Sequence, residues 1–425
     1  MVENIKTTVE RGESARNSFF KRIATFTEEG SNDDKTHPTY KDKITRQPVV
    51  TFVDKEKKQK CLSIPEDEGQ SFADIMTRYD KQVLDIEYIM KWPVTTFPWA
   101  ICKEEEKSRT CSKAVFRNYL QRLNPVKPIK DGLNISCTVV DAMRIVRIIP
   151  ITGLKPPTFQ TWVNKVLDHI MKLPGNVIHI VFDVYSPLPD LTRPSKTRNS
   201  FAGQRRYLSD LSQQLPPLKN AWVDFLSNNA NKHDLTNLIT DFILSTKFVA
   251  RCPVYVTKNQ KCSLKEVDGN VTDIEDLYSV HKEADPRIAL HVVFASSATL
   301  GETVCVVSDD TDVFIILLYI VNQLQGKLYF RQGTKTIGKG IEYHDVSALA
   351  AQLGTTCCQN LLGFHALTGS DFTYPFFGRG KSQSFSMMMN LRNSKTRTVS
   401  VGKLETLGTN QPNIKEIEDF ILHTI

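Results

Sequence analysis

The stretch VCVVSDDTDVFIILL, from Val304 to Leu318, decides the fold, because it places three aspartates between two strongly apolar runs. The first run, VCVV, is short and continuous, which is typical of a strand buried on both faces of a sheet. The second run is expected to continue as a helix. Asp309, Asp310 and Asp312 then stand where a buried strand ends, which is where open α/β sheets form their polar sites.

Short apolar strands and helical segments alternate from Leu133 onward. LNISCTVV, NVIHIVF and PVYVT are near-continuous apolar runs, which indicates a mostly parallel sheet covered on both faces. TFQTWVNKVLDHIMKL has one apolar helical face, with hydrophobic residues at spacings of three and four: Phe159, Trp162, Val163, Val166 and Ile170. The sequence therefore predicts an α/β fold with a mainly parallel central sheet flanked by helices.

Further acidic residues end other predicted strands or open predicted helices. CTVV runs into Asp141 and IHIVF runs into Asp183, so three strands are expected to end in aspartate at the same edge of the sheet. In HKEADPRIALH, Glu283 and Asp285 stand where a helix is expected to begin, with Asp285 as its N-cap and Pro286 as its first residue.

Such a collection of acids needs compensating charge. Together with Asp371, which precedes the turn-rich FTYPFFGRGK, these carboxylates would raise one another's pKa unless cations were present. Two divalent ions, Mg²⁺ or Mn²⁺, would balance them, because these hard ions prefer carboxylate ligands. Taken singly, Asp141 and Asp285 could be helix caps, Asp183 a turn residue and Asp312 a loop residue. The set together favours a metal site.

The composition is that of a globular chain with a slight basic excess. The 425 residues are 40% hydrophobic, enough for two or three domains with at least one sizeable core. Lys and Arg number 54 against 47 Asp and Glu, and the net charge of +7 suits a polyanionic partner but is common in proteins without one. A charged N-terminus, no apolar run of membrane-spanning length and no CxxC pair predict an intracellular protein, in the nucleus or cytoplasm, with reduced thiols.

Changes in composition divide the chain into four segments. Residues 1–70 are rich in charge, Thr and Ser and are expected to be largely disordered or loosely attached. Residues 71–130 form an expected N-terminal accessory region, and the linker-like NPVKPIKDG separates it from an α/β core at 131–390. Residues 391–425 are expected to form a C-terminal tail.

The motifs VVDAM, VFDVYSP, EAD, SDDTDV and LTGSDFTYPFFGRGK carry a resemblance to a known family. Their order and approximate spacing are similar to those of the XPG and flap-endonuclease family of 5′ nucleases, within the PIN-like superfamily, over about Leu133 to Leu391. In the most specific motif, Gly378 and Gly380 follow Asp371 by seven and nine residues, as in that family. The whole layout also resembles a group of animal PIN-like proteins without an established activity.

The resemblance implies a PIN-like core and a structure-selective nuclease that hydrolyses phosphodiester bonds, in DNA rather than RNA, with two Mg²⁺ or Mn²⁺ ions. Asp309 matches an acid that is usually secondary in the family, and Asp285 stands where the family usually has Glu. The positions that match the family's metal-binding, catalytic carboxylates are Asp141, Asp183, Glu283, Asp285, Asp310, Asp312 and Asp371.

Two basic features are candidate contacts to nucleic acid. The GRGK turn resembles the family's element that grips duplex backbone, which implies contacts at Gly378, Arg379, Gly380 and Lys381. The stretch from Pro187 to Tyr207 is interpreted either as a segment that captures single-stranded ends or as a solvated loop with incidental charge. Its basic residues are Arg193, Lys196, Arg198, Arg205 and Arg206.

Two other function classes bear on this interpretation. A phosphatase of the haloacid-dehalogenase type also uses a strand-end D-x-D, but it needs Thr where this chain has Phe314. A nuclease-like fold that only binds nucleic acid or acts as a scaffold would be expected to have lost several acids, and these are intact, although intact acids are also compatible with low activity. For a metal site, Asp310→Ala or Asp312→Ala should abolish cleavage and leave thermal stability unchanged or higher.

Overall fold

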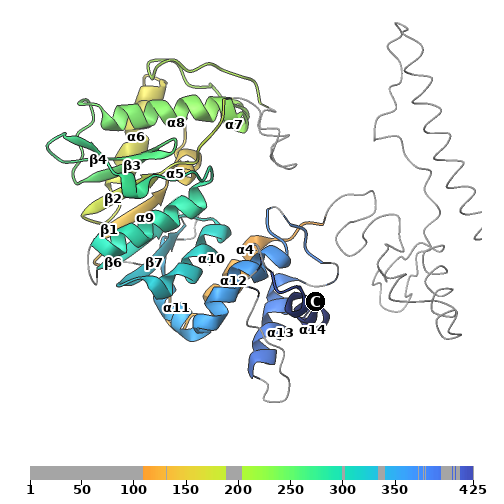
Figure 1. Ribbon diagram of the computed structural model, residues 1–425. Helices are drawn as coiled ribbons and strands as arrows, with labels where there is room; N and C mark the ends of the chain where they lie inside the picture. The colour runs from red at the N-terminus through yellow and green to blue at the C-terminus, as the bar shows by residue number, and fades with distance from the viewer. Residues whose placement is uncertain are drawn as a thin grey trace, which may run out of the picture. The chain divides into compact units, whose positions relative to one another are not determined.

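A mixed sheet forms the centre of the computed structural model (Figure 1). Its strands are β1 (Cys137–Asp141), β2 (Val177–Val181), β3 (Val254–Lys258), β4 (Lys261–Lys265), β5 (Val271–Asp273), β6 (Thr303–Val307), β7 (Lys327–Gln332) and β8 (Glu342–Asp345). Their order across the sheet is β5-β4-β3-β2-β1-β6-β7-β8. All neighbours from β3 to β7 in this order are parallel, whereas β4, β5 and β8 pair antiparallel at the edges. The predicted α/β fold with a mostly parallel sheet is confirmed.

Part of the chain is described by the structure, and all of it falls within one unit, Phe97–Ile425. The described residues are 109–130, 132–187, 203–298, 302–333, 340–371, 373–376, 378, 380–393, 404, 407 and 412–424. The range 1–70, expected to be disordered or loosely attached, lies outside them, as does most of the expected accessory range 71–130.

Helices contribute to two hydrophobic cores, one on each face of the sheet (Figure 1). The first core contains α5 (Ala142–Ile148), α6 (Phe159–Met171), α7 (Lys219–Ser227) and α8 (Asn229–Leu244). The second contains α4 (Lys113–Arg122), α9 (Ala284–Ala298), α10 (Thr311–Ile320), α11 (Val346–Leu353), α12 (Thr355–Leu367), α13 (Lys381–Asn393) and α14 (Ile414–Thr424). Two 3-10 helices, η3 (Glu275–Leu277) and η4 (Val321–Gln323), complete the described elements.

The apolar strands are continuous because successive side chains enter different cores. In β1, Val139 belongs to the second core and Val140 to the first. The segment from Val304 to Leu318 behaves in the same way. Val306 and Ile315 are fully buried in the second core, while Val307 is fully buried in the first. These packed flanks fix the backbone on both sides of the three aspartates.

Both ends of the described chain pack more closely than their composition indicates. Phe116 and Leu120 of α4, within the expected accessory region, are fully buried in the second core. Phe420 of α14, within the expected C-terminal tail, is 1% exposed in the same core. The boundaries placed at 131 and 391 therefore cut through one core, because the linker-like run before β1 joins two elements that pack together.

Two expectations about the environment of the chain can be compared with the described residues. No disulfide links any of the described cysteines. Burial raises the pKa of Cys137, Cys262 and Cys305 to about 12, so these thiols stay protonated at neutral pH. None of the described helices combines the length and apolar character needed to cross a bilayer.

Candidate metal centre

The carboxyl ends of three adjacent parallel strands bring acids to one edge of the sheet. β1 lies between β2 and β6, and the register pairs Asp141 with Val181 and Val140 with Val307. Asp183 stands two residues beyond β2, and Asp310 stands three residues beyond β6. Acids that are far apart in the sequence therefore leave the sheet at the same level.

Asp141 serves two roles at this edge. It caps α5 by accepting a hydrogen bond from the backbone N–H of Arg144 at 3.1 Å, and its other oxygen accepts one from the Ser308 hydroxyl at 3.1 Å. Burial, with a smaller contribution from Asp183, raises the pKa of Asp141 to about 6. The capping interpretation and the strand-edge interpretation of Asp141 both hold.

Asp183 links β2 to the start of α9. Its Oδ1 accepts a hydrogen bond from the backbone N–H of Ala284 at 2.7 Å, and its Oδ2 accepts one from the Tyr185 hydroxyl at 2.6 Å. Because α9 begins at Ala284, the prediction that Asp285 is the N-cap and Pro286 the first helical residue is wrong. The Asp183 carboxylate, just beyond β2, accepts the hydrogen bond from the first N–H of α9 that a local N-cap residue would otherwise satisfy. Glu283 precedes α9 and is exposed.

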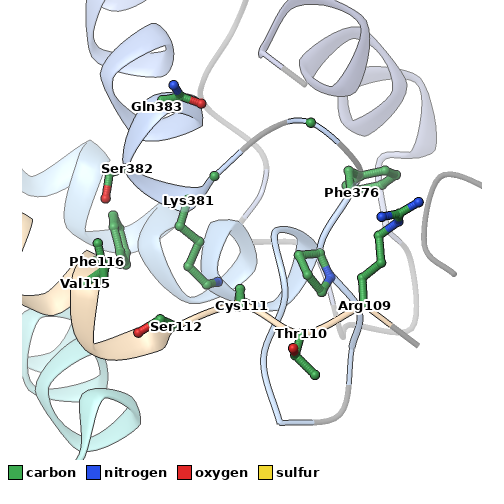
Figure 2. A pocket seen from close by; sticks show the side chains of 13 residues that line it. Arg109, Thr110, Cys111, Ser112, Val115, Phe116, Phe376, Lys381, Ser382 and Gln383 are labelled. Atoms are coloured by element: carbon green, nitrogen blue, oxygen red, sulfur yellow. The ribbon is translucent and has the colours of Figure 1, made fainter. Parts of the chain in front are cut away.

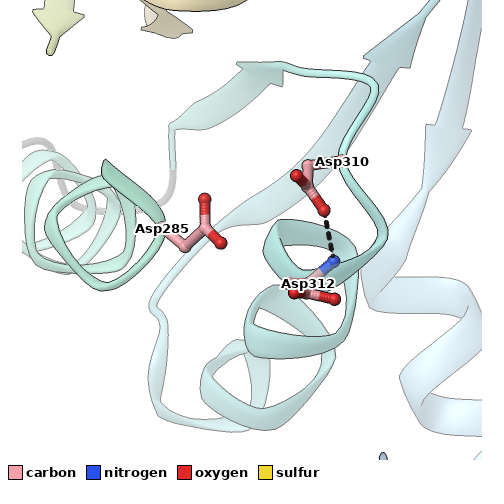
Figure 3. Close-up of side chains that lie close together, drawn as sticks. All are labelled: Asp285, Asp310 and Asp312. Atoms are coloured by element: carbon pink, nitrogen blue, oxygen red, sulfur yellow. Dashed lines mark hydrogen bonds between the residues drawn. The ribbon is translucent and has the colours of Figure 1, made fainter. Parts of the chain in front are cut away.

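Three carboxylates meet at the centre of the site (Figure 3). Asp285, in the first turn of α9, Asp310 and Asp312 each offer an oxygen, and these oxygens lie within 4.8 Å of one another. Asp310 is the N-cap of α10 and accepts a hydrogen bond from the backbone N–H of Asp312 at 2.8 Å. This cap holds the Asp310 side chain in place.

Asp285 is the least compensated of these acids. Burial, followed by the charges of Asp310, Asp183, Asp312 and Asp141, raises its pKa to about 8. None of the described residues donates a hydrogen bond to it. A half-buried carboxyl with four acidic neighbours and no described donor fits a divalent cation, because oxygen-only ligand sets suit Mg²⁺ and Mn²⁺.

Two residues that the sequence did not single out pair with acids on the other side of the site. Lys113 Nζ lies 2.7 Å from Asp312 Oδ2 and 2.6 Å from Asp371 Oδ1. His365 Nε2, from α12, lies 2.9 Å from Asp312 Oδ1. Although burial raises the pKa of Asp312, the hydrogen bonds from His365 and Lys113 outweigh it and lower that pKa to about 2. The site is therefore asymmetric, with Asp312 and Asp371 paired and Asp285 unpaired among the described residues.

Lys113→Met should tighten Mn²⁺ binding by on the order of tenfold, or ~1.4 kcal/mol. The Lys113 ammonium competes with an incoming cation for Asp312 and Asp371, and Met keeps the aliphatic stem without the charge. Calorimetric titration of the wild type, Lys113→Met and the control Lys327→Met, which changes an exposed residue at the start of β7, measures the effect. Equal affinities in all three proteins would show that Lys113 does not compete.

Asp309 lies outside the cluster, as expected for a secondary acid. Its Oδ2 is 2.6 Å from Nε of the buried Arg144, and its Oδ1 accepts a hydrogen bond from the Gly333 N–H at 3.1 Å. Arg117 donates to its backbone carbonyl. Asp309 therefore ties the end of β6 to α5 and α4, while Asp310 and Asp312 face the centre of the site.

The GRGK turn, implied as a nucleic-acid contact, has its lysine buried inside the protein. Lys381 is 5% exposed, and its Nζ donates to the His365 carbonyl at 2.6 Å and to the Thr368 hydroxyl at 2.9 Å, so it differs from a surface phosphate contact. Burial lowers its pKa to about 7. With Gly378, Gly380 and the segment that starts at Arg109, it lines a pocket of about 490 Å³ (Figure 2).

The basic stretch is described only at its end. Arg205 is 2.7 Å from Asp234 of α8, and Arg206 donates to the Gln214 carbonyl at 2.5 Å, so both side chains already have partners within the protein. Outside the described residues lie Arg193, Lys196, Arg198 and Arg379.

No protein-family model matches the chain, and a search of curated proteins also finds no match. The chemistry open to the site follows from its own residues: a carboxylate cluster on a rigid sheet edge, able to hold divalent cations, with Lys113 beside it.

Proposed function

We propose that this protein is a metal-dependent, structure-selective nuclease with a PIN-like core, acting on DNA in preference to RNA. The observation that carries the proposal is the meeting of Asp285, Asp310 and Asp312 within 4.8 Å at the carboxyl edge of a mostly parallel sheet. Perturbed acids in such a position concentrate at functional sites. The motif resemblance adds support over the same residues.

The acids divide into those that would hold ions directly and those that flank them. Asp285, Asp310 and Asp312 would hold one ion, and Asp141 and Asp183 stand beside them at the ends of β1 and β2. When bound, two Mg²⁺ or Mn²⁺ ions supply an activated water and neutralise the charge of a scissile phosphate. Asp371 would bind an ion in the position that the Lys113 ammonium occupies, 2.6 Å from Asp371 Oδ1. Glu283, exposed before α9, is the weakest member of the set.

The chain's own contribution is rigid placement. Asp310 is fixed by its bond to the Asp312 N–H, Asp141 by its bond to the Arg144 N–H, and Asp183 by the Ala284 N–H. Each of these bonds ends at the first turn of a helix that is packed into a core. Side chains held in this way keep their alignment, which in-line attack at phosphorus requires.

The proposal is tested with flap, bubble and single-stranded oligonucleotides, as DNA and as RNA, incubated with the wild-type protein and Mn²⁺ or Mg²⁺. The expected result is ion-dependent cleavage that prefers one of the structured DNA substrates and stops in EDTA. Cleavage that persists in EDTA would contradict the metal-dependent mechanism. Equal cleavage of every substrate would contradict structure selectivity.

One observation favours the alternative of a catalytically weak or inactive protein that binds nucleic acid or acts as a scaffold. Lys113 already pairs with Asp312 and Asp371, so an ion must displace an ammonium group that is bound at two points. For this alternative, the same oligonucleotides would bind with a salt-dependent affinity but remain uncut at any Mn²⁺ concentration. Cleavage by the wild type rules the alternative out.

A further inference from the structure

Two cations, Arg147 and Lys232, flank the acid edge on the side away from Lys113. Arg147 is exposed on α5, the helix that Asp141 caps. Lys232 is in the first turn of α8, and its Nζ lies 4.5 Å from the centroid of the Tyr185 ring. The hydroxyl of the same Tyr185 donates a hydrogen bond to Asp183. One tyrosine therefore connects the lysine to a carboxylate of the proposed metal centre.

Neither cation has an acidic partner among the described residues. Other basic side chains near the site do: Lys113 pairs with Asp312 and Asp371, and Arg144 pairs with Asp309. The Lys232 ammonium contacts the Tyr185 ring, and no described residue hydrogen-bonds to the side chain of Arg147. Two positive groups close together repel each other, and an anion between them would relieve that repulsion.

The electrostatics of Lys232 agree with this geometry. Burial, followed by the positive charge of Arg147, lowers the pKa of Lys232 to about 8, while Asp183 acts in the opposite direction. The positive charge of Arg147 also acts to lower the pKa of Asp141 and of Tyr185. The two cations are thus near enough to affect each other and both strand-end acids, although they come from different helices.

We propose that Arg147 and Lys232 form a subsite for the phosphate next to the one that is cleaved. The inference rests on the proposed function and narrows its substrate to polynucleotides, because a molecule with a single phosphodiester cannot reach the acid edge and this subsite together. A phosphate bound here would be held by charge-assisted hydrogen bonds from the guanidinium and the ammonium. The Tyr185 ring holds the ammonium of Lys232 in position.

The test compares Arg147→Gln/Lys232→Gln with the matched control Lys172→Gln/Lys327→Gln. The control removes two exposed lysines that stand before β2 and at the start of β7, at the opposite edge of the sheet. Both double variants change the net charge by the same amount. Circular dichroism and thermal unfolding establish that each variant is folded.

The first measurement is kcat/KM for a single-stranded oligonucleotide and for bis(p-nitrophenyl) phosphate, which has one phosphodiester. We expect the site variant to lose ~100-fold on the oligonucleotide, since two charged hydrogen bonds are lost, and to match the wild type on the small ester. The control should match the wild type on both substrates. A similar loss on both substrates, or an equal loss in the control, overturns the subsite.

The second measurement does not depend on turnover, so it separates the subsite from the nuclease proposal. Binding of a fluorescent single-stranded oligonucleotide is followed against salt concentration in Ca²⁺. The slope of log K against log salt should fall by about 0.7 in the site variant, since the subsite holds one phosphate and each phosphate contact on a single strand contributes ~0.7. A slope equal to that of the control overturns the subsite. If the wild type cleaves neither substrate but the slopes differ as expected, the nuclease proposal fails and the phosphate subsite stands.

Discussion

Asp310→Asn is expected to lower Mn²⁺-dependent cleavage by at least ~10³-fold, equivalent to ~4 kcal/mol of transition-state stabilisation. Asp310 belongs to the three-carboxylate cluster and caps α10. Asn is as good an N-cap as Asp, so this substitution removes the charge while keeping the helix start. Single-turnover cleavage of an end-labelled oligonucleotide at saturating protein measures the loss in the chemical step.

The neighbouring residue supplies the control. Asp309→Asn changes the charge by the same amount one position earlier, at a side chain that faces Arg144 instead of the cluster. We expect its cleavage rate to stay within about threefold of the wild type, which corresponds to less than ~1 kcal/mol, although its thermal stability should fall. Comparable losses in both variants would mean that Asp310 acts through general charge or folding and not as an ion ligand.

Asp285→Asn is expected to raise the thermal stability of the metal-free protein at pH 8 by several degrees. The folded-state pKa of Asp285 is about 8 and its ordinary value is 3.8, so the native state binds more protons than the unfolded state between these pH values. Stability therefore falls as pH rises from about 4 to 8, and since a pKa difference of one is worth ~1.4 kcal/mol, the ionised group costs on the order of a few kcal/mol. Asn removes that cost.

Thermal unfolding of the wild type and Asp285→Asn at pH 5 and pH 8, in EDTA, measures this effect. The variant's advantage should be larger at pH 8, and saturating Mn²⁺ should raise the melting temperature of the wild type more than that of the variant. An advantage that does not grow with pH would show that Asp285 is not held among like charges.

Asp312 should behave in the opposite way, which corrects the expectation that its removal preserves stability. Its folded-state pKa of about 2 is below the ordinary 3.8. Its contribution is therefore present above pH 4 and is lost as pH falls toward 2. Asp312→Ala leaves Lys113 and His365 without this partner and should cost ~1–3 kcal/mol at neutral pH. The simple repulsion argument fails here because it ignored cations supplied by distant segments.

The sheet and the placement of the strand-end acids could be predicted because both depend on local patterns. Continuous apolar runs specify buried parallel strands, and parallel strands end at the same edge. Asp141 ends β1 and Asp310 follows β6 closely, so the alignment of those two strands settles where both residues lie. The start of α9 was missed because its amide is capped by Asp183, which is 101 positions away from Ala284 in sequence.

The residues that pair with Asp312 were not predictable in the same way. Lys113 and Asp312 are 199 positions apart, and His365 and Asp312 are 53 apart, so no local spacing connects them. Lys113 also lies before the linker-like run that was taken as a boundary. The packing of Phe116 against Phe364 and Phe385 helps to bring α4 to the acid edge.

Calorimetric titration of Mn²⁺ into the metal-free protein at pH 7, in two buffers of different ionisation enthalpy, tests the central claim that these carboxylates form a divalent-metal centre. We predict saturable binding of two ions with the release of close to one proton, because Asp285, with its pKa of about 8, is protonated at pH 7 and must ionise to bind a cation. Asp310→Asn should weaken binding strongly, and Asp285→Asn should abolish the proton release. No saturable binding in the wild type, or binding that is unchanged in Asp310→Asn, would contradict the account.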